Sequence, residues 1–363
     1  MQINISLYIK KSKMSIINIT KGNYGGLDHF SREVFNYLSK EFEEKIFYFY
    51  PEGNKIYKKF NKSEIFFLEF NGEVIYVNLF RKIKELINCD LIHVHHTKAW
   101  ILFSPLFLFK DKIVYSLHGN FGSNIKKGLL TKLIILLIIN YITIFSQKII
   151  CLTNPQKENI QKYCLFKKRL DKKVIIINNF IKKENILKHK KILNDKIIFV
   201  GRYTKLKGFE DLINLAKDSK NIHFSLVGED NFENKLDNIE NIGKIDHSQI
   251  FKEYDKCSIL ILPSYTESWG LVITEAMARG LVVLASDLPT IREYFIDGRN
   301  GYLFPTGDVE KMKELILYLK NNPKEIERIS KNNLKDIWKF TEEKQINKYV
   351  KVYEEILKEN KKR

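Results

Sequence analysis

Two glutamates, Glu267 and Glu275, lie eight positions apart in the chain, inside the stretch 263–280. A short apolar run, 258–262, precedes the stretch and predicts a buried parallel strand. Good helix formers follow from Gly270 onwards, and Gly280 is typical of a helix end. A helix N-terminus presents unpaired N–H groups and a positive dipole end, which favour phosphate. The stretch therefore predicts a site for a phosphorylated sugar, with a carboxylate on either side of the helix start to bind hydroxyls.

Two cations, Arg202 and Lys207, occur in a second stretch of strand, basic loop and helix. The apolar run 196–200 predicts the strand, and the apolar spacing in 209–217 predicts the helix. An arginine binds phosphate oxygens in pairs, whereas a lysine acts as a point charge. We interpret the two cations as anion ligands; the competing interpretation is a solvated basic loop.

The first half of the chain has a similar order of elements. A strand at 14–20 precedes a loop with Gly25 and Gly26, and apolar residues at helical spacing follow. Glycines let a backbone approach a ligand closely, but the loop is not Gly-x-Gly-x-x-Gly, so a dinucleotide site is not indicated. A plain turn is the alternative interpretation of the two glycines.

Histidines end two further strands that we predict at 90–96 and 112–118. His93 and His95 share one strand face, but no cysteine or carboxylate nearby completes a metal-ligand set. His118 is followed by glycine, and a neutral imidazole at a strand end can bond a hydroxyl or a phosphate oxygen. A structural turn histidine is the other interpretation of His118.

The motif around the two glutamates resembles a known signature. Pro-Ser-x-x-Glu-Ser-x-Gly-Leu-x-x-x-Glu-Ala-Met-Ala-x-Gly is similar to the donor site of retaining glycosyltransferases of family 4, and Gly-Arg-x-x-x-x-Lys-Gly resembles their diphosphate clamp. The resemblance is specific over about 196–304 and diffuse before it. It implies an α/β protein of the GT-B fold, in which two Rossmann-like domains face each other across a cleft and the last helix crosses back to the first domain. We expect an acceptor-side domain at 1–181 with the helix at 341–363, a linker at 182–195 and a donor domain at 196–340.

The resemblance also implies roles for particular residues. Glu267 is expected to hold donor-sugar hydroxyls, Glu275 the ribose hydroxyls, and His96 the acceptor side. The catalytic set is expected to comprise Glu267, His118, Arg202 and Lys207. The donor-binding set is expected to comprise Gly25, Gly26, Arg202, Lys207, Ile245, Glu267, Gly270, Leu271, Val272 and Glu275. The chain departs from the family at Gly228-Glu229-Asp230, where Gly-x-Gly is usual, and at Asn178-Asn179, where proline and glycine are usual.

The activity that the resemblance implies is transfer of a sugar, with retention of configuration, from a nucleoside diphosphate to an acceptor hydroxyl. The acceptor is expected on a lipid-linked or cell-surface glycan. No Asp-x-Asp stands between strands, so neither a metal nor another cofactor is expected. The alternatives are a GT-B phosphorylase, a sugar epimerase, or a non-catalytic basic protein that binds membranes or polyanions.

Composition limits the setting of the protein. Its 363 residues are 44% hydrophobic, and four cysteines lack paired spacing, which indicates a reducing compartment without a disulfide framework. The start of the chain lacks the basic and long apolar segments of a signal peptide, so a cytoplasmic location is expected, with peripheral attachment to the inner face of a membrane as an option. Residues 1–191 contain 33 Lys and Arg and 15 Asp and Glu, so 33 − 15 gives the whole net charge of +18. The basic half favours a polyanion or an anionic membrane surface, and a general bias toward Lys and Ile in the composition is the alternative explanation. We expect no nucleic acid, because no nucleic-acid-binding module is recognisable.

The most apolar segment is 129–145. It is shorter than the about 20 residues that a membrane-spanning helix needs. Two interpretations stay open, because periodicity does not separate buried from lipid-facing residues. One is a helix in the core of the first domain, and the other is an interfacial helix that rests on a membrane.

Overall fold

The computed structural model describes residues 15–21, 43–50, 65–69, 90–95, 112–119, 128–189, 194–228, 232 and 236–360. The chain forms two compact units, which are described separately. Unit 1 comprises Met1–Ile177 and Ile346–Arg363, and unit 2 comprises Asn178–Gln345.

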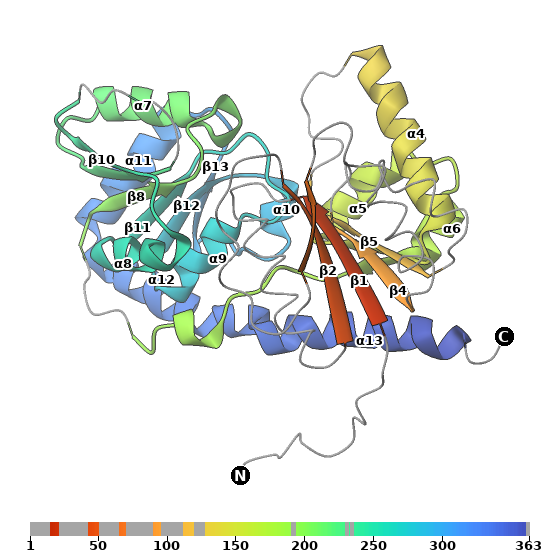
Figure 1. Cartoon of the computed structure of the whole chain (residues 1–363). Helices are drawn as coiled ribbons and strands as arrows, with labels where there is room; N and C mark the ends of the chain where they lie inside the picture. The colour runs from red at the N-terminus through yellow and green to blue at the C-terminus, as the bar shows by residue number, and fades with distance from the viewer. Residues whose placement is uncertain are drawn as a thin grey trace, which may run out of the picture. The chain divides into compact units, whose positions relative to one another are not determined.

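The described part of unit 1 contains a seven-stranded parallel sheet in the order β3-β2-β1-β4-β5-β6-β7 (Figure 1). The strands are β1 (Ser15–Lys21), β2 (Glu43–Tyr50), β3 (Ile65–Glu69), β4 (Leu91–Val94), β5 (Ile113–Leu117), β6 (Lys148–Cys151) and β7 (Val174–Ile176). Strand order runs outward in both directions from β1, so the switch point lies between β1 and β4. This is the order of a doubly wound Rossmann-like sheet, in which ligands bind beyond the carboxyl ends of the strands at the switch point.

Four described helices belong wholly or mainly to unit 1: α4 (Leu129–Phe145), α5 (Asn154–Gln161), α6 (Lys167–Lys173) and α13 (Glu342–Asn360). Helix α13 begins in unit 2 and belongs to unit 1 from Ile346 onwards. Its Tyr353 hydroxyl lies 2.5 Å from Nδ1 of His93 on β4. The chain therefore returns to its first unit through the final helix, as the resemblance predicts.

Unit 2 repeats the same design. Its described strands form a six-stranded parallel sheet in the order β10-β9-β8-β11-β12-β13, with the switch point between β8 and β11. The strands are β8 (Ile197–Val200), β9 (Phe224–Val227), β10 (Ile239–Gly243), β11 (Ile259–Leu262), β12 (Val282–Ser286) and β13 (Gly301–Phe304). The helical segments are η2 (Lys183–Asn185), η3 (Lys205–Lys207), α7 (Phe209–Lys217), α8 (His247–Lys256), α9 (Leu271–Ala278), α10 (Pro289–Arg292), α11 (Val309–Asn321), α12 (Pro323–Asp336) and η4 (Ile337–Phe340).

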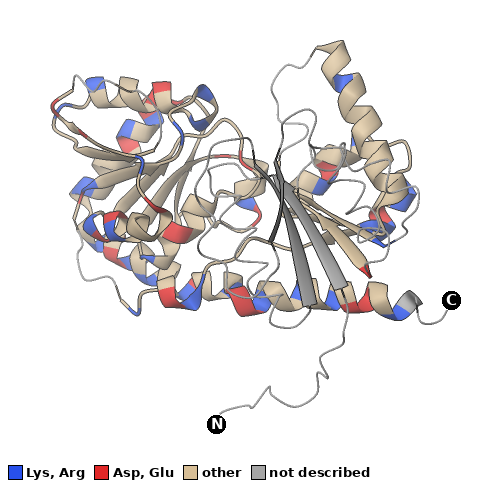
Figure 2. Cartoon of the chain, in the orientation of Figure 1, with Lys and Arg blue, Asp and Glu red and all other residues tan. Residues whose placement is uncertain are grey.

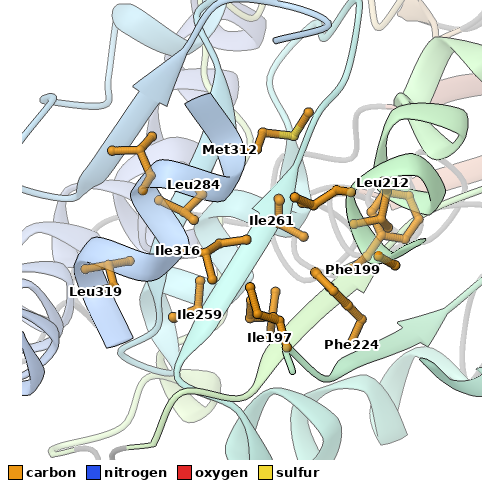
Figure 3. Packing of buried hydrophobic residues seen from close by; sticks show 14 of the residues in the cluster. Ile197, Phe199, Leu212, Phe224, Ile259, Ile261, Leu284, Met312, Ile316 and Leu319 are labelled. Carbon is orange, nitrogen blue, oxygen red and sulfur yellow. The ribbon is translucent and has the colours of Figure 1, made fainter. Parts of the chain in front are cut away.

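The core of unit 2 lies on both faces of its sheet, because successive side chains along a strand point to opposite faces. On one face, Ile197, Ile259 and Leu284 pack against Leu212 of α7 and a row on α11 that comprises Met312, Ile316 and Leu319 (Figure 3). On the other face, neighbouring strand residues pack against α9 in a second cluster that contains Ile198, Leu260, Val283, Ile273 and Met277. Burial on both faces explains why these strands are continuous apolar runs without alternation.

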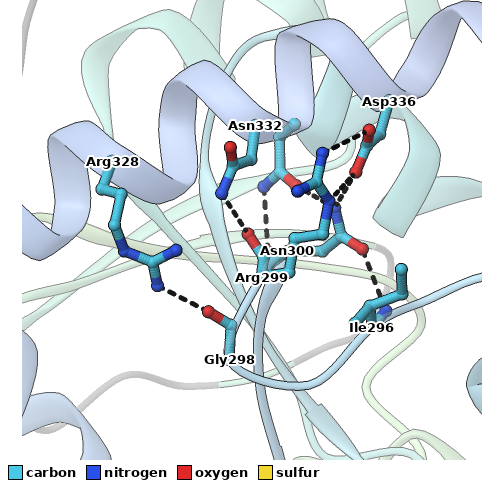
Figure 4. Close-up of polar contacts among 8 residues, drawn as sticks. Ile296, Gly298, Arg299, Asn300, Arg328, Asn332 and Asp336 are labelled. Atoms are coloured by element: carbon cyan, nitrogen blue, oxygen red, sulfur yellow. Dashed lines mark hydrogen bonds and ion pairs between the residues drawn. The ribbon is translucent and has the colours of Figure 1, made fainter.

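A buried polar network attaches α12 to the turn before β13 (Figure 4). The amide nitrogen of Asn333 donates to the carbonyl oxygens of Leu281 at 2.6 Å and Asn300 at 2.9 Å. The Arg299 guanidinium donates to both carboxylate oxygens of Asp336 at 2.7 and 2.9 Å, and these bonds lower the pKa of Asp336. Helix α12 was not among the predicted elements, although Ile326 and Ile329 on its buried face stand at helical spacing after Pro323.

Segment 182–195, which the sequence predicts as a linker, belongs to unit 2 in its described part. Its Ile186 side chain is buried in the second core cluster, and the backbone N–H of Leu187 donates to the carbonyl oxygen of Ala278 at 2.9 Å. The apolar residues scattered through this Lys-rich segment therefore include a side chain that packs in the core of unit 2. In the described residues, none of the helices combines the length and the apolar character that crossing a membrane requires.

Candidate functional site

The sequence motifs of unit 2 meet at its switch point. Strands β8 and β11 are parallel neighbours, with Ile197 paired to Ile259. Arg202 and Lys207 follow the carboxyl end of β8, and Glu267 follows the carboxyl end of β11. Carboxyl ends of neighbouring parallel strands share one edge of a sheet, so sequence positions about 60 residues apart become adjacent.

Lys207 and Glu267 form a direct ion pair, with 2.6 Å between Nζ and Oε1. The hydroxyl of Ser264 donates to the same carboxylate oxygen at 2.8 Å. The Thr290 hydroxyl donates to the backbone carbonyl of Glu267 at 2.8 Å and fixes the loop itself. The Glu267 side chain is only 8% exposed, so these contacts hold a nearly buried carboxylate in one orientation beside a cation.

The two loops that carry this pair are joined through their backbones. The N–H of Tyr265 donates to the carbonyl oxygen of Leu206 at 2.9 Å. Gly208 adopts φ +67° and packs against the carbonyl group of Pro263. The Lys-Gly pair of the basic motif is thus the point at which the loop after β8 contacts the loop after β11.

Helix α9 begins directly after a turn that aromatic side chains stabilise. Gly270 has φ +78°, and the buried Trp269 before it stacks on Tyr294 with ring centroids 4.1 Å apart. The Tyr294 hydroxyl donates to the carbonyl oxygen of Trp269. Burial, followed by the nearby charge of Glu267, raises the pKa of Tyr294, so its hydroxyl stays protonated as a donor. The turn therefore fixes the positive end of α9, where Leu271 and Val272 form the first turn.

Glu275 lies on α9 and is 5% exposed. His247 Nε2 lies 2.8 Å from its Oε1, and the Tyr254 hydroxyl donates to its Oε2 at 3.1 Å. Burial is the main cause of the raised pKa of Tyr254, and the Glu275 carboxylate adds to it. Both partners come from α8, and neither was predicted as a site residue. Tyr254 lies at helical spacing from the apolar Phe251, so its pattern indicates only a buried position.

In unit 1, His118 pairs with another histidine. Its Nε2 lies 3.1 Å from Nδ1 of His95, and the two rings are stacked. His93 Nε2 lies 2.7 Å from the Ser116 hydroxyl, and its Nδ1 contacts Tyr353 of α13. Neither pair was predicted, because the contact of His95 with His118 beyond two neighbouring strands and the contact of His93 with Tyr353 of α13 are both tertiary.

The remaining predicted residues lie as follows. Arg202 is exposed on the loop after β8, and Ile245 is half-buried just beyond β10. Gly25, Gly26 and His96 lie outside the described residues. Within the part of the chain that is described, no cluster of three or more His, Cys, Asp or Glu side chains has the arrangement of a metal site.

Comparison with known proteins identifies the class of protein. Residues 178–336 match the family model for glycosyl transferases group 1. An uncharacterized glycosyltransferase of Methanocaldococcus jannaschii is 30% identical over 302 residues, which cover 79% of this chain and 82% of the relative. An Escherichia coli O-antigen biosynthesis glycosyltransferase is 23% identical over 82% of this chain and 91% of the relative. The solved structure of Anabaena HepE with UDP and glucose has a TM-score of 0.78 at 15% identity and covers 93% of this chain and 98% of HepE.

The two doubly wound sheets, together with structural neighbours that include HepE and a Thermosynechococcus elongatus sucrose-phosphate synthase, define a protein of the GT-B fold. The chain belongs to the group 1 glycosyltransferases.

Because of the histidine cluster in unit 1, we expect the free energy of unfolding to fall in mild acid. Burial, and then the nearby histidines, lower the pKa of His93 and His95, so both are neutral in the folded protein. Unfolded histidine binds a proton near pH 6.5, so the unfolded state gains protons first as the pH falls. The stabilising effect is complete above about pH 6.5 and is lost below it. We expect a lower thermal midpoint at pH 5.5 than at pH 7.5.

The measurement is thermal unfolding across this pH range with His93→Gln and with the exposed His223→Gln as control. The first variant should flatten the pH dependence, and the second should keep the wild-type slope. An unchanged slope in His93→Gln would contradict the assignment to the buried cluster.

Proposed function

We propose that this glycosyltransferase moves a hexosyl group, with retention of configuration, from a nucleoside diphosphate sugar to an acceptor hydroxyl without a metal ion. The observation that carries the proposal is the Lys207–Glu267 ion pair, held at the switch point beside the fixed N-terminus of α9. Cation, buried carboxylate and helix N-terminus together suit a ligand that combines phosphate with sugar.

The diphosphate binds to three sources of positive charge. Lys207 supplies a point charge, Arg202 a planar pair of donors, and the first turn of α9 supplies backbone N–H groups. When the bond between sugar and phosphate breaks, negative charge grows on the leaving diphosphate. Fixed donors stabilise that charge without reorganisation, which is the work that a divalent cation would otherwise do.

The two carboxylates bind the two sugar rings of the donor. Glu267 accepts hydrogen bonds from the hydroxyls of the transferred sugar, next to Gly270, Leu271 and Val272. Glu275 accepts from the ribose hydroxyls, with Ile245 near the base. His247 and Tyr254 hold the Glu275 carboxylate in place before the donor arrives. The acceptor attacks from the face that the diphosphate leaves, because the sequence supplies no separate protein nucleophile.

The acceptor is a hydroxyl on a glycan, lipid-linked or at the cell surface. Supporting this class, the Escherichia coli relative is named for O-antigen biosynthesis, and a Staphylococcus aureus protein that is 26% identical over 165 residues is named for capsular polysaccharide biosynthesis. In unit 1, the family resemblance assigns His118 to the donor sugar, His96 to the acceptor side, and Gly25 and Gly26 to donor binding.

The test is a thermal-shift panel of UDP-, GDP- and ADP-sugars on the full chain, since a ligand that binds only the folded state raises its midpoint by mass action. Glu275→Gln should lose the shift from the preferred donor, whereas Glu253→Gln, which changes the half-buried partner of Lys256 on α8, should keep it. No shift with any nucleotide sugar would contradict the proposal. Turnover that requires inorganic phosphate, or that needs no acceptor, would instead indicate a phosphorylase or an epimerase.

A further inference from the structure

Helix α4 has two apolar faces. One face is buried in unit 1 and includes Ile135, Ile139 and Ile142. The opposite face is exposed to solvent, with Leu129 85%, Leu130 70% and Leu137 59% exposed. We call the following set the α4 surface: Leu129, Leu130, Leu133, Ile134, Leu137 and Ile144 of α4, with the exposed Leu165 and Phe166 before α6.

The α4 surface is a continuous stripe. Leu130, Leu133, Leu137 and Ile144 recur at helical spacing and extend along about 21 Å of the helix axis. Leu165 is attached to the same helix, because its backbone N–H donates to the Asn140 side chain at 2.7 Å. A group of large aliphatic side chains on one exposed face marks an interaction site.

A basic helix borders this surface. Helix α6 carries Lys167, Lys168, Arg169 and Lys172 in exposed positions, and it packs beside α4. Figure 2 shows α4 almost without charge and blue segments gathered on α6. The Arg169 guanidinium donates to the carbonyl oxygen of Ile144 at 2.9 Å, which fixes the positive charge at the apolar stripe. The one acidic residue of α6, Asp171, is paired with Lys157 at 2.8 Å.

We propose that the α4 surface with its α6 border docks the enzyme onto an anionic lipid bilayer, with α4 lying in the plane of the interface. Aliphatic side chains enter the acyl boundary while the lysines and Arg169 meet lipid phosphates. Helix α4 lies on the membrane and does not span it, because its 17 residues are fewer than the about 20 that spanning needs and its other face is packed in the core of unit 1.

Charge favours a bilayer over a second copy of the chain. Two copies joined through this surface would bring two α6 helices of the same sign together, which is unfavourable. An anionic bilayer complements both the apolar stripe and the cations. The net charge of +18 lies entirely within residues 1–191, which include α4 and α6. The electrostatic field of this half of the chain is therefore positive, like that of α6.

The test is co-sedimentation of the full chain with vesicles of phosphatidylcholine alone or of phosphatidylcholine mixed with phosphatidylglycerol. We expect at least about tenfold stronger partition onto the anionic vesicles, weakened by salt. Leu133→Glu/Leu137→Glu should lower that partition by about tenfold or more, and Lys167→Gln/Lys168→Gln should lower it by a similar factor. The control Ile296→Glu/Leu317→Glu changes exposed apolar residues of unit 2 and should leave binding unchanged.

The assay requires neither donor nor acceptor, so its outcome is independent of the proposed function. Equal binding to both vesicle types, or wild-type binding by either unit 1 variant, would overturn the proposal. A chain that ignores vesicles but sediments as a dimer, and becomes a monomer in Leu133→Glu/Leu137→Glu, would assign the α4 surface to a second copy instead. Circular dichroism of each variant establishes that it is folded.

Discussion

Replacement of Lys207 by alanine is expected to lower kcat for sugar transfer by about 10²–10³-fold, the usual effect of removing one group that stabilises charge in a transition state. The ammonium group lies 2.6 Å from Glu267, where the proposal places the sugar and its leaving phosphate. Charge develops on the diphosphate mainly as the bond breaks, so kcat should fall more than KM rises. Lys207→Arg keeps the charge and should retain part of the activity.

The measurement is the rate at which nucleoside diphosphate is released from the donor that the thermal-shift panel identifies. Lys205→Ala is the matched control, because Lys205 is exposed on the same 3-10 turn and should keep nearly wild-type turnover. Glu267 loses a partner in Lys207→Ala, so the unfolding midpoint should be recorded beside the rates. Wild-type kcat in a folded Lys207→Ala protein would refute the role of this cation.

Gly208→Ala is expected to destabilise unit 2 by about 3 kcal/mol. An alanine at φ +67° carries a left-handed penalty of about 1–2 kcal/mol. Its Cβ would also lie 1.9 Å from the carbonyl oxygen of Pro263, so the two loops must separate, at a further cost of about 1–3 kcal/mol. For a domain of this size the thermal midpoint should fall by roughly 6–12 °C.

Gly243→Ala separates the two contributions. Gly243 has φ +74°, but an added Cβ meets nothing within 4 Å, so this variant should lose only the left-handed penalty. The same destabilisation in both variants would show that close loop packing contributes little. Because Gly208 follows Lys207 directly, the Gly208→Ala protein should also bind the donor more weakly than Gly243→Ala.

Local patterns were sufficient for most elements of unit 2. The predicted helix at 209–217 coincides with α7, and the predicted strand at 196–200 contains β8. Buried parallel strands are apolar throughout and loops at their ends carry glycine, so both signals lie within a few residues of sequence. Helix α12 was missed although its sequence is amphipathic, with Ile326 and Ile329 buried. What no local pattern indicates is its attachment to unit 2 by Asn333 and Asp336, which contact residues about 35–50 positions earlier.

Residue types and their spacing along the chain were enough to predict the motif residues and the type of ligand that they suit. Glu267, Glu275, Arg202 and Lys207 were identified from their types and spacing, which depend only on neighbouring positions. Tertiary structure decided what each carboxylate contacts: Lys207 and Ser264 for Glu267, and His247 with Tyr254 for Glu275. It also decided that α4 is half core and half exposed surface, a question that hydrophobic periodicity left open. Both outcomes have one cause. Pairing of the strands brings distant loops to one edge of the sheet and decides which face of a helix is buried. Local spacing along the chain predicts neither outcome.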